Sequence, residues 1–571
     1  MELIKEAKSY TTTQRFWKLL KPDSEEIKSV YAYSIFSGIV SLSLPLGIQA
    51  IINLIQGGQI NSAWMVLVFF VVLGIAGNGI LQIFQLRITE NIEQKIFTRA
   101  AFEFAYRIPK IKIEAMYNQF GPELMNRYFD VMNIQKGLSK ILISISTAAI
   151  QVVFGLILLS LYHPFFIMYS IFLVLFVYFI FRITAKKGLS TSLTESKHKY
   201  RLAHWLEEVA RTGISFKLAG RTDLPITEAE GHVSNYIDSR ENHFKVLIQQ
   251  YSLLVVFKVV IATTLLAVGG ILVMEQVMNI GQFVAAEIII LLVIASVEKL
   301  IVSLDVIYDT LTSLEKVGQV TDLELESTDG LDIMKECQTC GMAIDIKNLS
   351  FTYPYSNRKT LQNINLSIKD GERLLIAGKN GSGKSTLLHV IAGLYDIKEG
   401  VVSYDGLPRD NLNIESLRTI IGTCLDGEDL FEGKLIDNIT MGRANATFEN
   451  VKWAIERLGL QDFVKSLPKG FDSEIQPYGS KLPRSIIQKL IIARAIADKP
   501  KILLFEYTFE HIDEVHKRKI VDFITHPSNE WTVIASSSDP YIAQKFDNIV
   551  IMDGGEIKKK GNYEELKNEL K

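Results

Sequence analysis

The chain has 571 residues, of which 48% are hydrophobic and 22% charged, and its formal net charge is −2. This length exceeds that of one soluble domain and corresponds to about three to four domain-sized units. A mean hydropathy of +0.19 indicates a protein that lies partly in lipid. A net charge this close to zero provides no general basic surface, so nucleic acid is not an expected partner.

The N-terminal segment gives no sign of secretion, and the cysteines give only a weak sign of a metal site. Residues 1–27 contain no apolar core and no cleavage site, so we expect a cytoplasmic segment and not a signal peptide. Cys337 and Cys340 form one CxxC pair, and Cys424 is isolated. A single CxxC without a second pair or nearby histidines is a weak zinc signal, which favours three reduced thiols over a metal or redox site.

Six apolar runs follow, each about long enough for a helix to cross a bilayer. They are Val30–Ile55, Trp64–Leu86, Ile141–Leu161, Phe165–Ile183, Leu253–Met274 and Phe283–Val302. We expect residues 28–310 to form a six-helix transmembrane domain in contact with membrane lipid, and residues 311–341 to form a linker. Buried helices of a soluble protein are the alternative, but they would not produce the one-sided charge pattern of the connecting segments.

Lys and Arg are distributed unequally between these connecting segments. The segments after the first, third and fifth runs, Gln56–Ala63, Tyr162–Pro164 and Glu275–Gly281, contain neither residue, whereas the two longer segments are rich in both. The positive-inside rule therefore places both termini in the cytoplasm of a protein integral to the inner (cell) membrane. Lys258 and Glu287 fall within the apolar runs, where a charge is costly. They either line a polar translocation path or reach an interface, and the sequence leaves both readings open.

From about Met342 short β-rich runs alternate with helical patterns, which indicates an α/β domain over residues 342–571. The strand RLLIA is followed by a G-x-x-x-x-G-K-[ST] phosphate loop. Its glycines let backbone N–H groups face phosphate oxygens, and the next helix aims its positive end at the same anion. We expect Lys384 to reach the β- and γ-phosphates and Ser385 to hold Mg²⁺. The loop consists of Gly378, Lys379, Asn380, Gly381, Ser382, Gly383, Lys384, Ser385 and Thr386.

A membrane bundle followed by a phosphate-loop domain resembles an ABC exporter half-transporter over nearly the whole chain. YNQFGPELMNRYFDV is similar to the family's first cytoplasmic coupling region, and SLPKGFDSEIQPYG to the approach to its signature motif. The overall form of the chain resembles that of type I secretion and peptide exporters without their N-terminal peptidase domain. The resemblance implies a membrane α-helical bundle joined to a cytoplasmic ABC-type ATPase domain, with ATP and Mg²⁺ as cofactors. It also implies that Tyr353 is the aromatic platform under adenine.

The same resemblance locates departures from the family's catalytic pattern. Glu506 stands at the position of the magnesium-associated aspartate and Tyr507 at that of the catalytic glutamate. Asp426 replaces the glutamine near the metal, and Ser538 replaces the switch histidine. A phenol is neutral at pH 7 and a poor base, and general-base catalysis contributes about 10²–10⁴-fold. We therefore expect ATP binding with very slow hydrolysis and assign no residue a catalytic role; the metal ligands implied are Ser385, Glu506 and Asp426.

The signature motif is also altered. It reads LPRSI at residues 482–486, without paired glycines, so close backbone approach to a partner's γ-phosphate is not expected. Arg484 at the start of the following helix is a candidate substitute for contacting a phosphate. The family's dimer-contact aspartate is retained as Asp513. Misalignment of a divergent domain is the alternative, but the anchors ARA, ILLF and IVIMDGG leave little room to shift.

Two functions remain open on the sequence alone. The first is an ATP-binding/permease subunit that exports an unidentified substrate as a homodimer, or as a heterodimer with another ABC half-transporter, with a periplasmic adaptor protein as a further candidate partner. The second is a non-transporting, ATP-gated membrane scaffold or regulatory subunit. The complete membrane half favours transport, whereas the missing base favours the scaffold.

Overall fold

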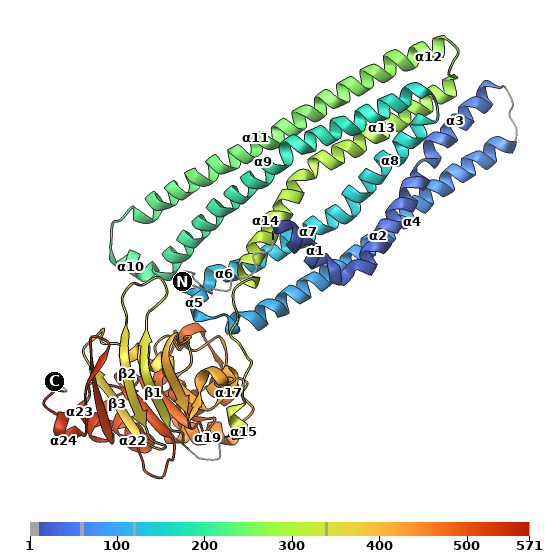
Figure 1. The fold of residues 1–571 in the computed structure, drawn as a ribbon. Helices are drawn as coiled ribbons and strands as arrows, with labels where there is room; N and C mark the ends of the chain where they lie inside the picture. The colour runs from blue at the N-terminus through green and yellow to red at the C-terminus, as the bar shows by residue number, and fades with distance from the viewer. Residues whose placement is uncertain (1–10, 58–61, 118–120, 337–340, 570–571) are drawn as a thin grey trace. The chain divides into compact units, whose positions relative to one another are not determined.

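The computed structural model describes residues 11–57, 62–117, 121–336 and 341–569. Contacts divide the chain into two units, Met1–Pro109 with Gln119–Leu323 and Lys110–Asn118 with Glu324–Lys571. The first unit is a bundle of long helices, and the second is an α/β domain (Figure 1).

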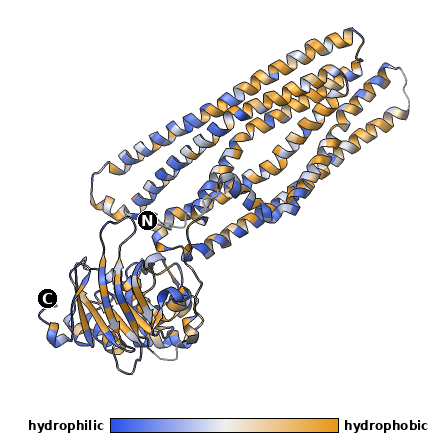
Figure 2. Ribbon diagram, in the orientation of Figure 1, coloured by the Kyte–Doolittle hydropathy of each residue, from blue (hydrophilic) through white to orange (hydrophobic). Residues whose placement is uncertain are grey.

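Six helical stretches among the described residues are long and apolar enough to cross a membrane. They are Thr12–Gln56, Ser62–Lys110, Glu123–Ser160, Pro164–Arg211, Leu224–Met274 and Ile280–Thr321. The predicted six-span membrane bundle is therefore confirmed. Because about 20 residues suffice to cross a bilayer, these helices extend well beyond it. Apolar residues dominate the part of the bundle that carries α12, and polar residues increase towards α10 (Figure 2).

Five of these stretches combine two or more helical segments, whereas Pro164–Arg211 is the single helix α9. The main helices are α1 Thr12–Leu20, α2 Ser24–Ser41, α3 Ser43–Gln56, α4 Ser62–Arg107, α7 Asp130–Lys140, α8 Ser146–Ser160, α9 Pro164–Arg211, α10 Gly213–Leu218, α11 Leu224–Thr264, α12 Gly270–Met274, α13 Ile280–Val302 and α14 Leu304–Thr321. Two π-helical turns, Ile141–Ile145 and Leu265–Gly269, connect α7 to α8 and α11 to α12. Helix α14 thus continues through the residues where a linker was expected to begin.

Charged and polar groups inside the bundle are paired across helices. Lys258 Nζ on α11 lies 2.8 Å from Glu298 Oε2 on α13. Gln250 Nε2 donates to the Tyr308 hydroxyl at 2.8 Å. Such pairing lowers the cost of a polar group in an apolar bundle. Glu287 on α13 is partly buried, and no ion pair is found for it within the described part of the chain.

The second unit is built on a six-stranded sheet with the order β12-β11-β3-β10-β9-β6. A four-stranded antiparallel sheet, β2-β1-β4-β5, and the pair β7-β8 complete the strands found in the described residues. The strands are β1 Ile344–Phe351, β2 Leu361–Ile368, β3 Arg373–Gly378, β4 Glu399–Tyr404, β5 Leu407–Pro408, β6 Ile421–Cys424, β7 Gly433–Lys434, β8 Glu474–Ile475, β9 Ile502–Glu506, β10 Thr532–Ser536, β11 Asn548–Asp553 and β12 Glu556–Gly561.

Helices cover this sheet and complete two apolar clusters. They are α15 Ile333–Glu336, α16 Lys384–Ile391, α17 Ile414–Thr419, α18 Leu435–Thr440, α19 Phe448–Arg457, α20 Gln461–Ser466, α21 Arg484–Ile496, α22 Glu514–Ile524, α23 Pro540–Gln544 and α24 Tyr563–Leu566. Every residue of β9 and β10 is buried, as expected for parallel strands with both faces covered.

The parallel strands β3, β10 and β9 are neighbours, so their carboxyl ends lie at one edge of the sheet. The phosphate loop follows β3, Tyr507 follows β9, and Ser538 comes two residues after β10. In open α/β sheets ligands bind at this edge. The topology therefore gathers the residues that the sequence singles out, although the phosphate loop precedes Tyr507 and Ser538 by more than a hundred positions.

The short segment Lys110–Asn118 packs with the second unit. The backbone N–H of Lys112 donates to the carbonyl of Glu324 at 3.0 Å. The carboxylate of Glu114 accepts from the backbone N–H of Asp396 at 2.7 Å. The ring of Tyr117 stacks against Tyr353 with centroids 5.9 Å apart. Tyr117 is the first residue of the sequence that resembles the family's coupling region.

Candidate functional site

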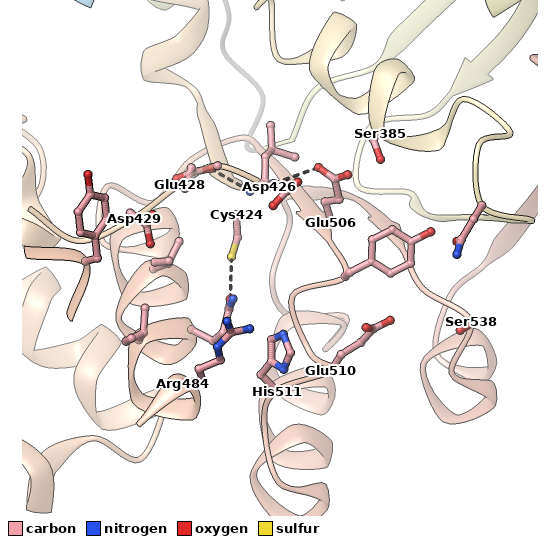
Figure 3. A pocket seen from close by; sticks show the side chains of 18 residues that line it. Ser385, Cys424, Asp426, Glu428, Asp429, Arg484, Glu506, Glu510, His511 and Ser538 are labelled. Atoms are coloured by element: carbon pink, nitrogen blue, oxygen red, sulfur yellow. Dashed lines mark hydrogen bonds between the residues drawn. The ribbon is translucent and has the colours of Figure 1, made fainter. Parts of the chain in front are cut away.

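A cavity of about 940 Å³ lies at the carboxyl edge of the parallel strands. This volume is in the range of small-molecule sites. Ser385, Asp426 and Glu506 line one part of it, and Glu510, His511 and Ser538 lie on the neighbouring segments (Figure 3). Tyr507 and Asn380 also contribute to the wall.

The glycines of the phosphate loop adopt conformations that other residues rarely take. Gly378 has a φ of 141° and Gly383 a φ of 101°, both in the left-handed region. A Cβ at Gly378 would lie 2.1 Å from the carbonyl oxygen of Met552, so the loop also needs glycine for space. Helix α16 begins immediately afterwards at Lys384. The loop thus has the backbone form that cradles phosphate in this motif.

Two polar side chains of the loop fit a phosphate ligand. The Ser382 hydroxyl is buried and has no hydrogen-bond partner within the described ranges. The buried Lys384 ammonium donates to the carbonyl oxygens of Gly378 at 2.7 Å and Lys379 at 2.8 Å. Since buried polar groups are rarely left unsatisfied, a phosphate oxygen is the ligand that this donor set lacks. Tyr353, two residues after the end of β1, approaches the loop through a 2.8 Å contact between its hydroxyl and that of Thr386.

Glu506 ends β9 inside the cavity wall. Its Oε2 accepts from the backbone N–H of Asp426 at 3.0 Å and lies 3.3 Å from His389 Nε2. Burial raises the pKa of Glu506, but His389, the Ser385 hydroxyl and the Asp426 N–H outweigh it and lower the pKa to about 2. The carboxylate is ionised at neutral pH.

Glu506 and Ser385 offer the oxygen ligands that Mg²⁺ prefers, and Asp426 is exposed beside them. Within the described residues no group of three or more His, Cys, Asp or Glu could hold a metal. Mg²⁺ usually keeps several waters and completes its shell with substrate phosphates. The residues present therefore fit a cation that arrives with a nucleotide.

His389 is a neighbour of this group that we did not identify from the sequence. It lies four residues after Ser385 on α16, and residues at that spacing share one helix face. The spacing could have identified it once Ser385 was taken as a metal ligand. Glu510 and His511, which line the cavity after Tyr507, were missed because a loop has no such periodicity.

Tyr507 directly follows Glu506 and has a φ of 46°, which is uncommon for a residue with a side chain. Its backbone N–H donates to the carbonyl of Ser536 at the end of β10, at 3.1 Å. The Lys384 ammonium lies 5.7 Å from the centroid of its ring. Tyr507, which the resemblance assigns to the family's base position, therefore lies beside the phosphate loop, and Ser538, assigned to the switch position, lines the same cavity.

The altered signature segment leads into α21, which begins at Arg484 with Pro483 as its N-cap. Arg484 is exposed and lines the same cavity. Asp513 caps α22 and accepts from the backbone N–H of His516 at 3.1 Å.

Cys424 is a buried free thiol whose pKa burial raises to about 12. Burial of this kind makes a thiol less reactive. Cys337 and Cys340, the CxxC pair, lie outside the described residues.

Residues 361–507 match the ABC transporter family. The chain is 30% identical over 298 residues to the alpha-hemolysin translocation ATP-binding protein HlyB of Escherichia coli O157:H7, covering 52% of this chain and 42% of that protein. It is 33% identical over 223 residues to a Staphylococcus aureus ATP-binding/permease protein whose name provisionally assigns it to multidrug export, covering 39% of each. These matches span less than half the length of the curated relatives.

The fold of a bacterial Atm1-family ABC exporter, solved with ATP bound, matches over 96% of both chains with a TM-score of 0.84 and 18% identity. Residues 361–507 thus carry the match to the ABC transporter family, and the chain as a whole has the fold of an ABC exporter, with six candidate spans and an α/β domain in one chain. The resemblance seen in the sequence is thereby confirmed. A domain of this type implies ATP as its ligand.

Proposed function

We propose that the chain is the ATP-binding/permease subunit of an exporter in the cell membrane, and that it binds Mg-ATP but hydrolyses it very slowly. The observation that carries the proposal is the pairing of an intact phosphate loop with Tyr507 at the base position. The exporter-like fold supports transport.

In this function, Lys384 would leave the loop carbonyls and meet the β- and γ-phosphates. Ser385 and Glu506 would hold the cation, which supplies charge neutralisation for the phosphates. Tyr507 would not accept a proton from water at neutral pH. The chain's own residues therefore support binding and orientation much better than hydrolysis.

A half-transporter is expected to work as a dimer, because one six-helix unit does not enclose a pathway and the family's ATP sites need two nucleotide-binding domains. We propose a homodimer or a heterodimer with another ABC half, with both termini in the cytoplasm. The competing proposal is a membrane scaffold whose state follows ATP occupancy, favoured by Tyr507 and Ser538.

Nucleotide binding and ATPase activity of the full chain in lipid, alone and with any co-encoded ABC half, would test the proposal. We expect Mg-ATP to bind with turnover about 10²–10⁴-fold below that of a site with a working base. Vectorial movement of a solute in proteoliposomes would favour transport over the scaffold. Fast, vanadate-sensitive turnover by the unmodified chain alone would refute the slow-hydrolysis reading.

A further inference from the structure

Tyr507 is held where its side chain borders the phosphate loop. Its left-handed backbone is costly for a residue with a Cβ and persists where the surroundings fix it, often at functional sites. The hydrogen bond from its N–H to Ser536 ties this backbone to β10. The side chain then forms part of the cavity wall that also contains Ser385 and Asn380.

The ring lies next to the group that meets the terminal phosphates. The separation of 5.7 Å between the Lys384 ammonium and the ring centroid is within the range of cation–π attraction. The ammonium donates to neutral carbonyl oxygens of the loop. Because a charged phosphate is a stronger acceptor, the ammonium can turn to it when one is present. A ligand phosphate contacted by Lys384 therefore lies within reach of the Tyr507 hydroxyl.

The chemistry of this hydroxyl differs from that of the carboxylate found in the family. The cavity already holds the carboxylates of Glu506, Asp426 and Glu510, which repel a γ-phosphate when no cation intervenes. A phenol adds no negative charge and has an O–H to donate. Hydrogen bonds from donors to charged acceptors are the stronger ones.

We propose that Tyr507 recognises the γ-phosphate: its hydroxyl donates a hydrogen bond to the terminal phosphate of bound ATP and so makes the chain distinguish ATP from ADP by binding. The inference rests on the proposed function, in which ATP is bound and slowly turned over. It adds a specificity role to a residue whose base function is lost. The phenol also occupies the position of a base beside the phosphate. Because it is a poor base at neutral pH, ATP is hydrolysed slowly and the ATP-bound state lasts longer.

The test uses the full chain in lipid nanodiscs with Mg²⁺ and compares Kd values for AMP-PNP, which is not hydrolysed, and for ADP. Tyr507→Phe removes only the hydroxyl and keeps the ring beside Lys384. We expect its affinity for AMP-PNP to fall about tenfold, while its affinity for ADP changes less than twofold. Tyr541→Phe is the matched control, because its hydroxyl donates to Asp522 at 2.8 Å outside this cavity.

Equal loss of AMP-PNP and ADP affinity in Tyr507→Phe would mean that the hydroxyl has only a structural role, and no loss of either would mean that it does not contact the γ-phosphate. Both results overturn the inference and leave the proposed function intact. Fast ATP turnover by the parent, or no nucleotide binding by it, would instead refute the proposed function. Retained ADP binding shows that the variant is folded.

Discussion

The imidazole of His389 lies 3.3 Å from the carboxylate of Glu506 and joins the helix after the phosphate loop to the end of β9. Both side chains are largely buried, with 18% and 4% of their surface exposed. The contact helps to keep Glu506 ionised in a buried position, as its lowered pKa indicates. A bound cation would also help to keep Glu506 ionised, so the cation and the imidazole of His389 should partly replace each other.

We therefore predict that His389→Leu destabilises the nucleotide-free protein by about 1 kcal/mol, in the range for losing a partner of a buried charged group. Thermal unfolding in nanodiscs would measure this as a lowered Tm. Saturating Mg-ATP should reduce the difference between variant and parent, because the cation replaces the lost imidazole. A Tm difference that is the same with and without Mg-ATP would contradict this coupling.

Replacing Lys384 by Ala should lower the affinity for Mg-ATP by more than about tenfold, since a charge-assisted contact to phosphate is lost. A fluorescent ATP analogue titrated into the full chain would measure the change. Lys359→Ala is a suitable control, because Lys359 pairs with Glu399 at 2.6 Å and does not line the cavity. Equal binding by the parent and Lys384→Ala would show that the loop does not bind the phosphates.

The membrane topology is testable with single cysteines in a background in which Cys337, Cys340 and Cys424 are replaced. Gln276 lies between the fifth and sixth spans, and Arg221 in the longer segment between the fourth and fifth. The charge asymmetry predicts that Gln276→Cys reacts with an impermeant maleimide only from outside the cell. Arg221→Cys should react only in inverted vesicles. Reaction of both positions from one side would overturn the proposed orientation.

The sequence predicts the six spans and the ATP domain because their signals are local: apolar runs of bilayer length and one contiguous motif. Tyr507 and Ser538 could be placed from neighbouring anchors, such as ILLF before Glu506. The His389–Glu506 contact joins residues 117 positions apart, and only the parallel pairing of strands makes it visible. The partner of Lys258 likewise depends on how α11 faces α13, which hydropathy does not encode.

The last prediction concerns repair of hydrolysis. Tyr507→Glu would place a carboxylate beside the residues expected to hold Mg²⁺, and so restore a group that accepts a proton from water. We expect only a small rise in turnover, because Ser538 still replaces the switch histidine and Asp426 the neutral amide. Catalytic groups that act as a unit are not additive, so Tyr507→Glu with Ser538→His should exceed the product of the single effects.

Steady-state phosphate release by the purified chain in lipid would measure these rates, and Lys384→Ala in each background would give the zero level. ADP binding should persist in all repaired variants, which separates a failed repair from a failed fold. If the double variant shows no more than the product of the single effects, the two positions do not act on one reaction step. Tyr507→Glu alone reaching a rate near that of the double variant would instead mean that Ser538 is not limiting and that the base was the sole missing group.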